Sequence, residues 1–186
     1  MINHKHKFIF IHIPKCGGSS VENLLGWRGT RHSTMEFYMK KYASLNLNEY
    51  YKFTFVRNPW ARLVSWYIYH IKFKTSYPRY FKEWVKTGMK SHWNKVDGSY
   101  WGDKDPINCQ SWIADEKQYN FIGKLENLQQ DFDIVCDKIG IPQQQLPHKN
   151  ATKHKHYTEY YDDETREIVA EKYAKDIEQF GYEFEK

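Results

Sequence analysis

The chain has 186 residues, of which 40% are hydrophobic, 18% aromatic and 27% charged. This composition excludes an intrinsically disordered chain, and the length suits a single globular domain over residues 1–186. The 28 basic and 23 acidic residues give a net charge of +5, a mild excess that favours anionic ligands without indicating nucleic-acid binding.

The predicted elements alternate between strands and helices along the chain. Strands are expected over 7–13, 52–56 and 119–125, and helices over 19–26, 59–71, 126–139 and 162–179, with a helical turn within 80–88. Asn58 and Pro59 are a typical helix start, and Gly140 and Gly181 are typical stops. This alternation predicts an α/β, P-loop-like three-layer fold, in which helices flank a central parallel sheet.

The cysteine pattern and the N-terminal sequence bear on the cellular setting. Cys16, Cys109 and Cys136 are widely spaced and form no CxxC pair, which indicates reduced thiols rather than a disulfide framework. The apolar run at 8–13 is too short for a signal peptide, and no stretch is long enough to cross a membrane. We therefore expect a cytoplasmic protein.

A glycine-rich turn follows the first predicted strand in the segment "PKCGGSS". Strand, glycine-rich turn and helix together suit phosphate binding, because backbone N–H groups and the start of the helix converge on the anion. The segment is not a Walker A motif, since Lys15 precedes the glycines instead of following them. The alternative is an ordinary tight turn that contains glycines.

The segment "FTFVRNPWARLVSWY" again joins a strand to a helix. Arg57 follows the strand, Ser65 lies eight residues later, and Arg62 lies between them. At the carboxyl edge of the sheet, Arg57 would add a second anion pocket beside the first. Alone, Arg57 is equally consistent with a structural ion pair and Ser65 with a helix-surface serine. Together with the first turn, they indicate a ligand with two separated phosphate-like groups.

These two segments carry a resemblance to a known family. "HIPKCGGSS" and "FVRNPWARLVSWY" resemble the two donor-binding signatures of the sulfotransferases, and the carbohydrate-type branch is the most similar. The resemblance continues over 121–132, 146–152 and 160–184, whereas 73–118 matches less well. Cys16 stands where the family often has threonine, so a hydroxyl contact there is lost while backbone contacts remain.

The resemblance implies that the chain transfers a sulfuryl group from 3′-phosphoadenosine 5′-phosphosulfate (PAPS) to an acceptor hydroxyl, with a glycan as the favoured acceptor. The implied contacts of the 5′-phosphosulfate are Lys15, Cys16, Gly17, Gly18, Ser19 and Ser20. Arg57 and Ser65 would hold the 3′-phosphate. From its charge pattern, the basic loop that contains Lys153 would close over the nucleotide or meet an acidic acceptor, and the alternative is an ordinary solvated loop. Lys15 would also be catalytic, because it would neutralise the departing phosphate oxygen. No metal is expected.

An acceptor hydroxyl requires a general base, for which the interval between the two signatures offers candidates. His32 is the first choice, since carbohydrate-type relatives often carry a catalytic histidine or glutamate there and imidazole titrates near neutral pH. Glu36 is the second and Glu22 the third. The alternatives are a surface-loop histidine for His32, a helix-surface carboxylate for Glu36 and a solvated helix residue for Glu22.

Other interpretations stay open beside this one. A P-loop kinase would need magnesium and a triphosphate, and the aromatic, basic segment 77–101 would suit a nonenzymatic nucleotide- or nucleic-acid-binding module, a sugar groove or ordinary core packing. Nine histidines without ordered spacing are weak grounds for a metal site. Cys16, beside Lys15 and a helix start, is expected to have a lowered pKa and to be sensitive to alkylation. Glu126 is expected to join a strand end to the Arg57 region.

Overall fold

The computed structural model describes residues 1–26, 32–71, 78–89, 107, 110–112, 114–147 and 155–185. The strands are β1 (Ile2–Asn3), β2 (Phe8–Ile11), β3 (Tyr51–Val56) and β4 (Phe121–Lys124). The α-helices are α1 (Gly18–Leu24), α2 (Met35–Lys41), α3 (Pro59–Ile71), α4 (Phe81–Lys86), α5 (Leu128–Ile139), α6 (Asp163–Lys172) and α7 (Ala174–Phe180). Short 3-10 helices are η1 (Leu47–Glu49), η3 (Gln110–Trp112), η4 (Glu116–Gln118), η5 (Leu125–Asn127) and η6 (Tyr157–Tyr160).

Within these residues the strands form one sheet in the order β1-β2-β3-β4. The three longer strands are parallel, with Phe10 opposite Phe53 and Phe53 opposite Phe121. The predicted strands and their parallel pairing are thus confirmed. β1 is an addition that was not predicted, and it pairs antiparallel with β2. The chain is therefore an α/β protein with a mostly parallel sheet.

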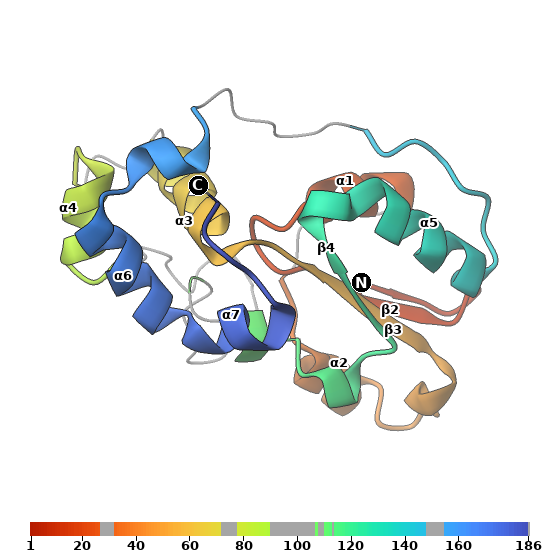
Figure 1. Cartoon of the computed structure of the whole chain (residues 1–186). Coiled ribbons are helices and arrows are strands. Elements are labelled where there is room, and N and C mark those ends of the chain that lie inside the picture. Colours follow the sequence, from red (N-terminus) through yellow and green to blue (C-terminus); the bar gives the residue numbers. More distant parts are fainter. Residues whose placement is uncertain are drawn as a thin grey trace.

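Helices pack on both faces of the sheet, and a further group of helices lies beyond the carboxyl ends of its strands. In Figure 1, α1 and α5 lie on one side of the strands and α2 on the other, whereas α3, α4 and α6 gather where β3 ends. One hydrophobic cluster fills the sheet layers and includes the stacked rings of Phe10 and Phe53, whose centroids are 5.0 Å apart. A second cluster, rich in Trp and Tyr, joins α3, α4 and α6. No helix in the described ranges is long and apolar enough to cross a membrane.

The helix boundaries follow local sequence signals, with one exception. Asn58 Oδ1 accepts hydrogen bonds from the backbone N–H groups of Trp60 (3.1 Å) and Ala61 (3.2 Å), which confirms the predicted cap of α3. Gly140 ends α5 at φ 68° and Gly181 ends α7 at φ 62°, conformations that favour glycine.

The prediction of one helix over 162–179 is wrong, because the chain bends at Tyr173 between α6 and α7. The Tyr173 side chain is buried, and its hydroxyl donates to the carbonyl of Ile107 at 2.5 Å. The backbone at Tyr173 has φ −108° and ψ 22°, outside the helical range. This tertiary anchor redirects α7 towards η3, which local helix propensity does not reveal.

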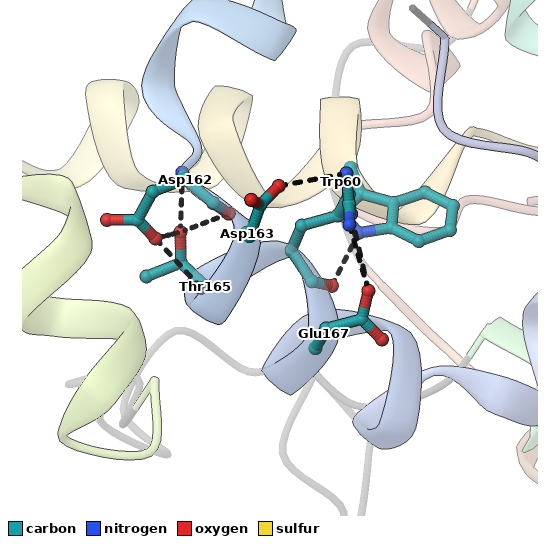
Figure 2. Close-up of polar contacts among 6 residues, drawn as sticks. Trp60, Asp162, Asp163, Thr165 and Glu167 are labelled. Atoms are coloured by element: carbon teal, nitrogen blue, oxygen red, sulfur yellow. Dashed lines mark hydrogen bonds and ion pairs between the residues drawn. The ribbon is translucent and has the colours of Figure 1, made fainter.

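The start of α6 is held by a reciprocal cap, which Figure 2 shows in close-up. The backbone N–H of Thr165 donates to Asp162 Oδ1 at 2.9 Å, and the Asp162 N–H donates to Thr165 Oγ1 at 3.0 Å. The Thr165 hydroxyl also donates to Asp162 Oδ1 at 2.5 Å. This bond, together with the one from the Thr165 N–H, holds the pKa of the Asp162 carboxyl well below its usual range. The indole N–H of Trp60 donates to the carbonyl of Arg166 at 3.1 Å, so the capped helix is also tied to α3.

We predict that Asp162→Ala lowers the free energy of unfolding by about 1 kcal/mol at pH 7, as expected for the loss of an N-cap. Because the folded-state pKa of Asp162 is depressed, the charge stabilises the fold above the unfolded pKa of about 3.9. This contribution declines as the pH falls below that value, so the difference from wild type should narrow. Urea denaturation at several pH values measures it.

The matched control is Asp163→Ala, since Asp163 is in the same turn but its side chain is 92% exposed. Its effect should stay within about 0.5 kcal/mol. Equal losses for the two variants would contradict the capping role of Asp162.

Candidate functional site

The parallel pairing of β2 and β3 brings the two signature segments to one edge of the sheet. Arg57, just after β3, donates from Nη1 to the carbonyl of Lys15 at 3.3 Å. Arg62, on α3, donates from Nε to the carbonyl of Pro14 at 3.1 Å and is buried. Two arginines of the second segment thus hold two consecutive carbonyl oxygens of the first.

The loop between β2 and α1 has a backbone that few residues adopt. Lys15 has φ 69° and Gly17 has φ 78°, both in the left-handed region. A Cβ atom on Gly17 would lie 2.7 Å from Leu125 Cδ1, and one on Gly18 would lie 2.1 Å from His12 Cδ2. Position 17 therefore favours glycine for its conformation, and position 18 requires it for space, because the obstacle there is the His12 ring.

Exposure alternates along this loop. Lys15, Gly17 and Ser19 are half-buried, whereas their neighbours Cys16 and Ser20 are buried. The N–H of Cys16 donates to the carbonyl of Ile13 at 3.3 Å and that of Ser20 to the carbonyl of Gly17 at 3.0 Å. The loop donors suited to a ligand are therefore the N–H groups between them, where α1 begins. Such a half-exposed row of donors beside cations is suited to an anion.

The cations of the site come from both segments. The ammonium of Lys15 lies 4.1 Å from the ring centroid of Tyr69, one turn beyond Ser65 on α3. Tyr69 is 42% exposed, so Lys15 is at the molecular surface of the loop. Burial lowers the pKa of Arg57, but a guanidinium stays charged at neutral pH. Ser65 is buried on α3.

Cys16 differs from its prediction. Its thiol is buried and donates to Gln110 Oε1 at 3.1 Å. Burial raises the pKa of Cys16 to about 12, so the expectation of a lowered pKa and of sensitivity to alkylation is wrong. Desolvation of the thiolate outweighs the positive charges of Arg62 and Arg57 nearby. Cys136 is also free and buried, while Cys109 lies outside the described residues.

Gln110 and Asp176 are important residues that the sequence did not reveal. The Gln110 amide donates to the carbonyl of Arg57 at 2.7 Å and accepts from the N–H of Arg57 at 2.8 Å. The buried Asp176 carboxylate accepts from the backbone N–H groups of Gln110 (2.8 Å) and Ser111 (2.9 Å). One signal was present for Asp176: it lies at helical spacing from the apolar Tyr173 and Phe180, which places a carboxylate on a core-facing side.

Glu126 has the joining role expected of it. Its Oε1 accepts from the backbone N–H of Asn58 at 2.8 Å, and its Oε2 accepts from the hydroxyl of Tyr182 at 3.2 Å. Glu126, in η5 just after β4, is therefore bonded to the residue after Arg57. This contact holds the backbone just beyond the end of β3.

The three candidate bases lie in different surroundings. His32 is buried, not in a surface loop, and its Nδ1 lies 3.0 Å from the carbonyl of His12. Glu22 is also buried, and its Oε2 lies 3.1 Å from His12 Nδ1, so the solvated alternative for Glu22 is wrong. Glu36 is 72% exposed on α2 and forms an ion pair with Lys40 at 2.9 Å.

Some of the predicted site residues lie outside the described residues, and for others the structure gives only their burial. Lys153 and most of the aromatic segment 77–101 are among the former. Of that segment, Phe81 and Trp84 are buried core residues, whereas Tyr80 is 59% exposed. Among the residues that the structure describes, no cluster of three or more His, Cys, Asp or Glu side chains could hold a metal ion.

Comparisons with known proteins identify a family for this chain. Residues 1–183 match the model described as "Sulfotransferase family". An uncharacterized protein of Archaeoglobus fulgidus is 37% identical over 95 residues, covering 51% of this chain and 72% of that protein. Carbohydrate sulfotransferase 14 of Danio rerio and carbohydrate sulfotransferase 9 of Homo sapiens are each 26% identical, covering 98% and 95% of this chain. The chain spans 61% and 47% of their respective lengths.

A solved structure shares the fold. The crystal structure of a sulfotransferase from Alicyclobacillus acidocaldarius superposes with a TM-score of 0.52 and covers 93% of both chains, at 12% sequence identity. The α/β fold predicted from the sequence is thereby confirmed.

We predict that Gln110→Glu lowers the free energy of unfolding by about 2–3 kcal/mol, because the new oxygen cannot donate to Arg57 and faces the buried Asp176 carboxylate. Urea denaturation measures this loss. The control is Gln143→Glu, since exposed Gln143 bonds to Asp137 at 2.9 Å and the same repulsion is screened by water. Similar stability for both variants would contradict the role of Gln110.

Proposed function

Because the chain belongs to the sulfotransferase family, we propose that it is an enzyme that transfers a sulfuryl group from PAPS to an acceptor hydroxyl. The observation that carries this proposal is the joining of the two signature segments through Arg57 and Arg62, which bond the carbonyls of Lys15 and Pro14. This arrangement leaves loop N–H groups and two cations beside each other at the sheet edge. The match over residues 1–183 also supports a single sulfotransferase-like domain.

The residues at the sheet edge fit the donor. Its 5′ end carries an anhydride that a row of N–H donors can cradle, and Gly17 and Gly18 leave no Cβ in a loop already in contact with Leu125 and His12. Its 3′-phosphate requires a second cation, which Arg57 supplies. PAPS itself supplies the activated sulfuryl group.

Each residue has a role in this proposal. Lys15 and the backbone of Cys16, with Gly17, Gly18, Ser19 and Ser20, bind the 5′-phosphosulfate. Arg57 and Ser65 bind the 3′-phosphate. Lys15 also neutralises the charge that develops on the departing oxygen, a contribution of about 3–4 kcal/mol for a preorganised donor. The role of Lys153 stays a prediction, as does the cytoplasmic setting.

His32 is the proposed general base. A carbonyl oxygen can only accept, so the 3.0 Å contact with His12 requires the proton of the neutral ring on Nδ1. The lone pair then lies on Nε2, where it can take the proton of an acceptor hydroxyl. Glu36 stays the second choice, although its exposed position and its ion pair with Lys40 give it the properties of a helix-surface carboxylate.

A carbohydrate is the acceptor class that we favour. Two matched relatives carry the name carbohydrate sulfotransferase, and this similarity supports the choice. The predicted sugar-facing aromatic residues lie mostly outside the described residues. The kinase and nonenzymatic interpretations gain no specific observation, and donor binding without magnesium separates them from this proposal.

We predict that 3′-phosphoadenosine 5′-phosphate binds the protein without magnesium, and that Arg57→Ala weakens this binding about 10- to 100-fold. The magnitude is that of a hydrogen bond to a charged group. Isothermal titration calorimetry with this nucleotide and with AMP, which lacks the 3′-phosphate, measures the effect. The variant should lose much less affinity for AMP.

Lys40→Ala is the control, because Lys40 is an exposed lysine whose partner is Glu36. Equal losses for both nucleotides in Arg57→Ala would mean that Arg57 acts only by shaping the loop. If folded wild type binds neither nucleotide, the sulfotransferase proposal fails.

We predict that His32→Ala retains nucleotide affinity but lowers turnover at least about 100-fold, the typical contribution of a general base. Turnover is measured as nucleotide release from PAPS with a panel of carbohydrate acceptors. His156→Ala is the control, since the His156 side chain is 55% exposed. Unchanged turnover in His32→Ala would remove this residue as the base.

A further inference from the structure

Three buried polar side chains lie beneath the loop between β2 and α1, which we call the donor loop because it is proposed to bind PAPS. They are His12, just after β2, Glu22 on α1 and His32, just before α2. All three are less than 10% exposed. Buried ionisable residues are costly unless they are paired, so their grouping in the layer under the loop calls for an explanation.

The three side chains are connected in series. Glu22 Oε2 lies 3.1 Å from His12 Nδ1. The rings of His12 and His32 meet edge to face with centroids 4.5 Å apart, and His32 Nδ1 contacts the His12 carbonyl. Among the residues that the structure describes, His12 Nδ1 and the second oxygen of Glu22, Oε1, have no hydrogen-bond partner, so the contact between Glu22 Oε2 and His12 Nδ1 is an ion-pair contact without hydrogen-bond geometry.

The series is also in contact with the donor loop. The Cα of Gly18 lies against the His12 ring, since a Cβ there would be 2.5 Å from both Cγ and Nε2 of His12. Movement of the His12 ring would therefore displace either the loop or His32. One side of the ring supports donor contacts and another faces the candidate base.

We propose that Glu22 and His12 are positioning residues for His32, which hold its ring with the proton on Nδ1 and supply the negative charge that balances the imidazolium formed during transfer. This inference rests on the proposed function and deepens it. The proton of the acceptor hydroxyl goes to His32 Nε2 as the oxygen forms its bond to sulfur and the bond from sulfur to the departing phosphate oxygen breaks. Glu22 and His12 exchange no atoms with the substrate.

Glu22 is the acidic member of this group. The amino group of Met1 also interacts with Glu22, but burial lowers the pKa of this amine to about 5, so it is neutral at pH 7. Its N–H groups are directed to the Phe10 carbonyl, at 2.6 Å. On α2, the acidic residue nearest in sequence to His32 is Glu36, which is exposed and paired with Lys40. His12 and His32 are therefore the groups that Glu22 can influence.

The test replaces the charge and keeps the shape, in Glu22→Gln. We expect nucleotide affinity within about twofold of wild type and kcat at least tenfold lower, with KM for PAPS little changed. A nearby anion favours a protonated histidine. Its removal should therefore move the acidic limb of the kcat profile to lower pH, by about half a unit or more. Glu49→Gln is the control, because exposed Glu49 pairs with Lys7 far from the loop.

A measurement on wild type keeps the inference testable if Glu22→Gln does not fold. Nitrogen-15 spectra of the histidine rings identify which nitrogen of His32 carries the proton. We expect protonated Nδ1 and unprotonated Nε2 at neutral pH in the complex with 3′-phosphoadenosine 5′-phosphate. The opposite tautomer overturns the inference.

The outcomes separate this inference from the function on which it rests. An unchanged kcat and pH profile in folded Glu22→Gln overturns the positioning role while wild-type sulfuryl transfer stands. A parallel fall of nucleotide affinity and kcat also overturns it, since the pair would then only support the loop. If wild type neither binds the nucleotide nor transfers the group, the proposed function fails, whichever tautomer His32 has.

Discussion

The edge of the sheet where the two signature segments meet depends on the side-chain amide of Gln110. β3 ends at Val56, where its pairing with Lys124 of β4 also ends, so the backbone of Arg57 needs other partners. Gln110 bonds both the N–H and the carbonyl of Arg57, as a neighbouring strand would. The same amide oxygen accepts from the Cys16 thiol, and Asp176 holds the Gln110 backbone. One residue thereby links both signature segments to the C-terminal helix α7.

This network explains how the two signature segments meet at one edge of the sheet. With its backbone held by Gln110, Arg57 directs its guanidinium to the Lys15 carbonyl, and Arg62 takes the preceding carbonyl at Pro14. Carbonyl oxygens repel anions, so bonding them to arginines removes an unfavourable charge from the loop and adds two favourable ones. The cost is a pair of largely buried cations. A doubly anionic ligand is the partner that would offset it.

The strands and most helix ends could be predicted from local sequence signals. The features that depend on contacts between residues distant in sequence could not. The strands, the Asn58 cap and the glycine stops depend on neighbouring residues, and the parallel order placed Arg57 beside the loop. Gln110 has no such signal, because its partners lie 53 and 66 residues away. Cys16 shows the same limit: its proximity to Lys15 and a helix start predicted a lowered pKa, but burial raises it. The bend at Tyr173 likewise comes from a contact with Ile107.

The fold separates the three candidate bases, which the sequence alone treats as alternatives for one role. In the sequence, His32, Glu36 and Glu22 compete for one role. In the fold, Glu36 faces solvent, while Glu22 and His32 are both buried and both contact His12. His12 is also the side chain that excludes a Cβ at Gly18. In the proposed reaction the donor site and the base would therefore be coupled, because the loop that would hold the donor contacts the His12 ring that would orient the base. A displacement of the loop at Gly18 or of the His32 ring would therefore be transmitted to the other through the His12 ring.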